Sequence, residues 1–112
     1  MAFIKTVAPS GGSTTIPEMT LVGGARGATA NSISFTKAYS NIFVVTFAET
    51  SNTTFTSVNF PSGCTHTEVA SATKDVVTNG RGVKCYDLHN VAKNTTLTTQ
   101  WSTWSSVYAF TY

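Results

Sequence analysis

Charged side chains are scarce in this sequence. Asp, Glu, Lys and Arg make up 11% of its 112 residues, less than half of the roughly 25% found in an average soluble domain. The formal net charge is only +2 at pH 7, and the seven basic residues are scattered from Lys5 to Lys93 without forming a stripe. Proteins that bind nucleic acid or an anionic membrane surface concentrate basic side chains, so we expect neither as a partner.

Long apolar segments are missing as well. No run approaches the roughly 18 apolar residues of a membrane-spanning helix, and residues Met1 to Lys5 are not followed by the apolar core of a signal peptide. The sequence therefore predicts no membrane insertion and a product made in the cytoplasm.

Residue types that carry out catalysis are few and dispersed. There are only two histidines, and no Gly-x-Ser-x-Gly sequence that would hold a nucleophilic serine. The five acidic residues are spread over the chain as Glu18, Glu49, Glu68, Asp75 and Asp87. Two of them could meet in space as a glycosidase pair, but surface acids are the simpler interpretation. We expect no catalytic residues and no cofactor.

Cysteine is limited to two residues, and each is followed closely by a histidine. On strands, Cys64 and His66 would share one face, as would Cys85 and His89, so the four side chains could form a tetrahedral zinc site. Their spacing is not that of a zinc finger. A disulfide between the two cysteines and a pair of buried thiols are the alternatives, and cytoplasmic synthesis favours the thiols.

The stretch from Ser32 to Ala48 has the clearest pattern in the chain. Its first arm alternates apolar with polar residues up to Phe35, and its second arm, Ile42 to Ala48, is apolar on both faces. The alternation predicts a strand with one wet face, and the second arm predicts a strand covered on both sides. The intervening residues, 37–41, predict a tight turn, so we expect a hairpin.

Short strands with turn signals between them fill the rest of the sequence. We predict them at residues 2–7, 18–22, 53–60, 64–70, 76–77, 83–88, 96–104 and 107–112, with one or two helical turns over 68–75 as an alternative. The run Gly23 to Gly27 predicts a turn, and Asn79-Gly80 is the strongest hairpin signal. The pattern predicts an all-β protein with a single antiparallel β-sandwich or jelly-roll domain spanning 1–112, in which 1–15 is an N-terminal arm and linker.

Aromatic residues make up 12% of the chain, more than a small core with this many aliphatic residues needs. In an unbroken strand over 96–104, Trp101 and Trp104 face opposite ways, so one of them is a candidate surface aromatic. We take Trp104, Tyr108, Trp101 and Tyr86 as candidate ligand-binding residues. Such rings suit stacking on sugars or burial between subunits, with core packing as the alternative for each.

Two stretches resemble the C-terminal domains of tailed-phage tail fibres and receptor-binding proteins. The first is Ile-Ser-Phe-Thr-Lys-Ala-Tyr-Ser-Asn-Ile-Phe-Val-Val, from Ile33 to Val45, and the second is the aromatic ending from Ser106 to Tyr112. Asn79-Gly80 to Tyr86 occupies the place of the middle hairpin in those domains. The H-type lectin domain is similarly built.

The resemblance implies a non-enzymatic phage or prophage virion protein, made in the host cytoplasm. It implies a β-sandwich that forms a homotrimer, contacts other virion proteins through its N-terminal arm and recognises a host-surface glycan. A capsid decoration or head-fibre protein of the same fold is one alternative, and a carbohydrate-binding module is another.

Overall fold

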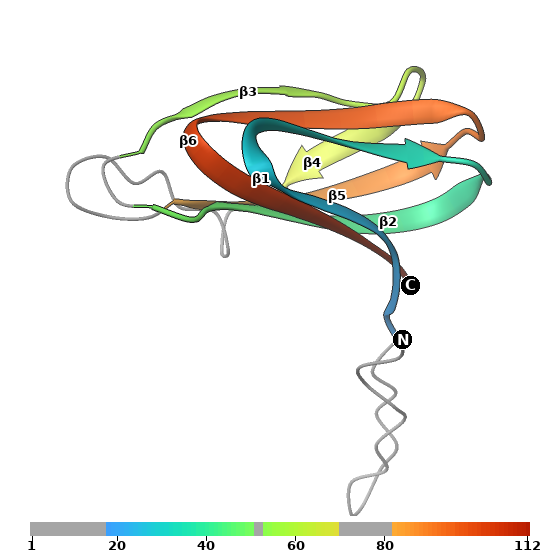
Figure 1. The fold of residues 1–112 in the computed structure, drawn as a ribbon. Helices are drawn as coiled ribbons and strands as arrows, with labels where there is room; N and C mark the ends of the chain where they lie inside the picture. Colours follow the sequence, from blue (N-terminus) through green and yellow to red (C-terminus); the bar gives the residue numbers. More distant parts are fainter. Residues whose placement is uncertain (1–17, 51–52, 70–81) are drawn as a thin grey trace, which may run out of the picture.

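The chain folds as an all-β protein, as the sequence predicts. A computed structural model describes residues 18–50, 53–69 and 82–112, which form six antiparallel strands and no helix (Figure 1). The strands are β1 (Thr20–Phe35), β2 (Tyr39–Ala48), β3 (Phe55–Asn59), β4 (Thr65–Glu68), β5 (Val83–Val91) and β6 (Thr95–Thr111). Across these described ranges, no helix has the length and apolarity needed to cross a membrane.

The sheet is organised around β6. Its order is β1-β6-β2-β5-β4, and β3 also pairs with β6. The first half of β6 lies between β3 and the second half of β1, whereas its second half lies between β2 and the first half of β1. Both long strands bend together, so one half of the sheet folds over the other (Figure 1). The sheet is not closed into a barrel, and a full jelly-roll connectivity stays a prediction.

The core lies between the two halves of the folded sheet. Side chains from both halves form one buried apolar cluster: Ile33, Phe35, Ile42, Val44, Tyr86, Leu88, Val91, Leu97, Val107 and Ala109. Alternate positions along β6 contribute to it, which is the period of two that the sequence shows. Burial of this cluster is the main stabilising term of the fold.

The predicted hairpin over Ser32 to Ala48 is wrong in its pairing. Both arms are strands, but the end of β1 pairs with β6, and β2 pairs with β5 and β6. The connection at residues 36–38 therefore carries the chain from one half of the sheet to the other. Alternation in a sequence predicts which side of a strand is apolar, but it does not identify the neighbouring strand.

The predicted turn at Gly23 to Gly27 is also wrong, because β1 continues through it. The strand has register shifts here, and Gly27 has a φ of 87°, which a residue with a side chain rarely adopts. A Cβ atom on Gly23 would lie 2.7 Å from the Ile33 side chain, and one on Gly24 would lie 2.6 Å from the Tyr108 ring. These glycines allow close packing along a bent strand rather than a chain reversal.

Several other predictions concern the ends and the loops. The two strands predicted over 96–104 and 107–112 form the single bent strand β6, and the strand predicted over 64–70 is β4. The predicted strands at 2–7 and 76–77, the arm and linker of 1–15 and the Asn79-Gly80 turn lie outside the described residues. So does most of the alternative helical segment at 68–75, whose first residue, Glu68, belongs to β4.

Candidate functional site

The two tryptophans face opposite sides of β6, as their spacing predicts. Trp101 is 1% exposed and belongs to the interior, whereas Trp104 is 64% exposed. They are three positions apart along the strand, an odd offset, so their side chains project to opposite faces. Trp104 is therefore the surface aromatic that the sequence pattern indicates.

Trp101 is held in the interior by specific contacts. Its Nε1–H donates a hydrogen bond to Thr46 Oγ1 at 2.9 Å, and the Phe55 ring meets it edge-on at a centroid distance of 5.0 Å. A Cβ atom on Gly82 would lie only 2.3 Å from the indole, so backbone packs directly against the ring. No face of Trp101 is open to a ligand in this conformation.

Tyr86, another candidate from the sequence, is 5% exposed and belongs to the core cluster. The Phe60 ring meets it edge-on at 5.1 Å. Trp101 and Tyr86 thus pack in the core, the alternative left open for each aromatic, and the candidate surface reduces to Trp104 and Tyr108.

Trp104 lies beside an open hollow of about 490 Å³, which we call the Trp104 hollow. Its other lining residues are Thr29, Thr50, Ser102 and Thr103. The backbone that presents the indole is fixed on both sides of it: Ser102 N donates to Thr54 O at 2.8 Å, and Glu49 N donates to Trp104 O at 2.8 Å. These four hydroxyl-bearing residues could not be singled out from the sequence, because Ser and Thr are common along the whole chain.

Tyr108 belongs to a different surface, on the outside of the β2–β6 half-sheet. Phe43, Val45 and Phe47 of β2 project there and are half-buried, as is Tyr108. The Tyr108 ring stacks on Phe47 at a centroid distance of 6.1 Å and covers Gly24. We call Phe43, Val45, Phe47 and Tyr108 the outer aromatic face. The sequence predicts that both sides of β2 are covered. The inner side is buried in the core, whereas the side chains on the outer side are only half-buried.

A polar cluster lies where β2, β5 and the end of the chain meet. His89 Nε2 lies 3.1 Å from Asp87 Oδ2, and His89 Nδ1 lies 2.9 Å from Asn41 Oδ1. The Tyr112 hydroxyl donates a hydrogen bond to Asp87 Oδ1. The pKa of Tyr112 is raised to about 12, mainly by desolvation and also by this contact with Asp87. Both ring nitrogens of His89 are engaged, so the cluster links β5 to β2 and to the end of the chain rather than offering a base.

The four residues of the zinc hypothesis do not come together. His66 pairs across the sheet with Leu88, on the core side, whereas Cys85 pairs with Val45 on the opposite side. Neither cysteine forms a disulfide, and burial raises the pKa of both the Cys64 and Cys85 thiols. In the part of the chain that the structure describes, no three His, Cys, Asp or Glu side chains could share a metal ion. Of the three alternatives, reduced thiols fit best, with Cys85 buried and Cys64 half-buried.

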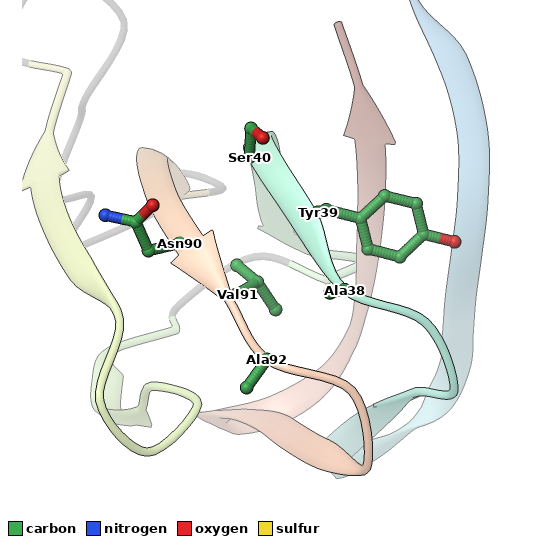
Figure 2. A pocket seen from close by; sticks show the side chains of 6 residues that line it. All are labelled: Ala38, Tyr39, Ser40, Asn90, Val91 and Ala92. Carbon is green, nitrogen blue, oxygen red and sulfur yellow. The ribbon is translucent and has the colours of Figure 1, made fainter.

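A further hollow, of about 310 Å³, lies between the start of β2 and the end of β5 (Figure 2). Small side chains and backbone line most of it, together with Asn90, whose φ is 61°. The Tyr39 ring points away from the hollow in Figure 2 and packs edge-on against Phe35 at 6.1 Å. This hollow therefore offers no flat apolar ring to a ligand, in contrast to the Trp104 hollow.

Comparison with models of protein families, with curated proteins and with solved structures finds no match for this chain. The resemblance to phage receptor-binding domains therefore stays a prediction from the sequence.

Proposed function

We propose that this chain is a non-enzymatic structural protein of a phage virion, of the tail-fibre or receptor-binding type, that assembles as a homotrimer and recognises a host-surface glycan. The outer aromatic face supports the assembly part of the proposal. Phe43, Phe47 and Tyr108 are large apolar side chains on a continuous sheet, and the described residues cover them only in part. A patch of this kind on a soluble protein commonly marks an interaction surface.

The composition of this face suits contact with a second protein surface. Phe and Tyr are enriched in the cores of protein interfaces, where charged residues are depleted. The four residues that define the face carry no charge, and the sheet backbone beneath them is already paired on both sides of β2. A further copy can therefore pack on it without a large loss of conformational freedom.

The mass in solution tests this assembly. We expect light scattering at several concentrations to give a trimer, and Val45→Lys to give a folded monomer because it places a charge in the middle of the face. Ser34→Lys is the matched control: it adds the same charge at an exposed position of β1 and leaves the trimer intact. A clean monomer of the unchanged protein at high micromolar concentration would contradict the trimer.

A carbohydrate-binding module is the second candidate, and the exposed indole of Trp104 is the observation that favours it. This alternative predicts a monomer that binds sugar. The same light-scattering measurement therefore separates it from the virion protein.

A further inference from the structure

We infer that the Trp104 hollow binds the apolar face of a neutral sugar ring, with Thr29 and Thr50 as hydrogen-bond partners of its hydroxyls. This deepens the receptor-binding function proposed above and rests on it. A pyranose has one face of C–H groups and a rim of hydroxyls, so a site for it needs a flat apolar platform bordered by uncharged polar groups.

The platform is the indole of Trp104. It is 64% exposed, and no other described ring stacks against it. Two backbone hydrogen bonds, at Ser102 and at Trp104 itself, hold its strand to residues on either side. Tryptophan has only two side-chain torsions, so a ring presented in this way offers a large contact area at a small entropic cost.

The polar border of the hollow is made of hydroxyl groups. Ser102 Oγ already accepts a hydrogen bond from Thr54 N at 2.8 Å, and Thr103 Oγ1 donates to Thr53 Oγ1 at 2.8 Å. Within the described residues, the hydroxyls of Thr29 and Thr50 have no such partner, so they remain available to a ligand.

The charge around the hollow favours a neutral ligand. None of its lining residues is charged. The backbone N–H of Glu49 donates a hydrogen bond to the Trp104 carbonyl oxygen. The Glu49 carboxylate, however, lies 3.6 Å from the Arg26 guanidinium and accepts a hydrogen bond from Ser106 Oγ at 2.9 Å. Sites for phosphate or carboxylate groups present unpaired Arg or Lys side chains instead.

The size and openness of the hollow fit part of a longer chain of sugars. Its volume of about 490 Å³ is within the roughly 300–1,000 Å³ of small-molecule sites. Because it is open to solvent, one ring can stack on Trp104 while the neighbouring units extend beyond the protein.

The test is a titration of the full chain with neutral hexoses, N-acetylhexosamines and their short oligomers, followed by saturation-transfer NMR. We expect binding to at least one of these probes, about 10-fold or more weaker in Trp104→Ala because an aromatic contact is lost. Trp104→Phe should retain part of the affinity. Thr29→Val and Thr50→Val, which keep the shape of the side chain, should each weaken binding several-fold.

Leu21→Ala is the matched control, because Leu21 is also an exposed apolar residue and lies outside the hollow, so its loss should leave the affinity unchanged. Failure of every neutral probe to bind the folded protein would overturn the inference, as would affinity that survives Trp104→Ala or binding restricted to anionic sugars. The mass of the same sample keeps the two proposals separable, since a trimer that binds no sugar contradicts the site and leaves the assembly standing.

Discussion

Thr46 is the residue that allows a tryptophan to be buried in this core. Its hydroxyl accepts the Trp101 indole N–H at 2.9 Å and lies 2.8 Å from the carbonyl oxygen of Ser106, to which it donates. Both partners are on β6, whereas Thr46 is on β2, so the Thr46 side chain joins the two strands through the Trp101 side chain and the Ser106 backbone. Without this acceptor, the indole N–H would be buried with no partner.

We predict that Thr46→Val lowers the free energy of unfolding by about 1–3 kcal/mol, the cost of leaving a buried donor unsatisfied. Urea unfolding followed by fluorescence measures it. The control is Thr98→Val, which removes a hydroxyl from the same sheet where the hydrogen bond to Ser32 is exposed to solvent, so its effect should stay within about 0.5 kcal/mol. Equal effects of the two variants would contradict the role assigned to Thr46.

For single residues, the sequence predicted which face of a strand a side chain occupies, but it did not predict which residues that side chain contacts. The odd spacing of Trp101 and Trp104 was enough to predict that one is buried and one exposed. Nothing in the sequence indicated that Asn41, Asp87 and Tyr112 meet, because their separations in the chain follow no local period. Such clusters depend on how the strands are ordered in the sheet.

The element that departs most from its expected form is β1. Glycines predicted a turn, but here they make room for neighbouring side chains, Ile33 over Gly23 and Tyr108 over Gly24. The first half of β1 also pairs with β6 through bulges, which allow the strand to bend. Glycine in a sequence signals a need for space or for unusual dihedral angles, and the sequence alone does not distinguish them.

We predict that Gly24→Ala destabilises the protein by about 1–3 kcal/mol, because the new methyl group displaces the Tyr108 ring from its place against Phe47. In a Tyr108→Ala background the same substitution should cost much less, since the ring is gone. Unfolding free energies of the four proteins form a double-mutant cycle. An additive cycle would show that the cost of Gly24→Ala does not come from the Tyr108 ring.

Over the whole molecule, composition and alternation were sufficient to predict an all-β chain, and the strand order was not. The order depends on pairings between residues far apart in the sequence, such as Thr20 with Thr111 and Phe35 with Thr95. Each such pairing closes a long loop, whose entropy must be lost before the contact stabilises the chain. Local patterns carry no information about these closures.

We therefore predict slow refolding, in the range of milliseconds to seconds that is typical of proteins dominated by long-range β pairing. Stopped-flow fluorescence of Trp104→Phe measures it, because Trp101 is then the single tryptophan and reports on closure of the core. Refolding within microseconds would contradict a fold whose formation waits for distant strands to meet.

The central position of β6 also has a consequence for synthesis on the ribosome. Translation proceeds from the N-terminus, so β1, β2 and β3 leave the ribosome before the strand with which all three pair has been made. Until then β1 and β2 lack their central neighbour and expose unpaired edges, which favour association between nascent chains. Folding of this domain therefore waits until β6 has been made, and the yield of native protein depends on how well the growing chain is shielded until Thr111 has emerged.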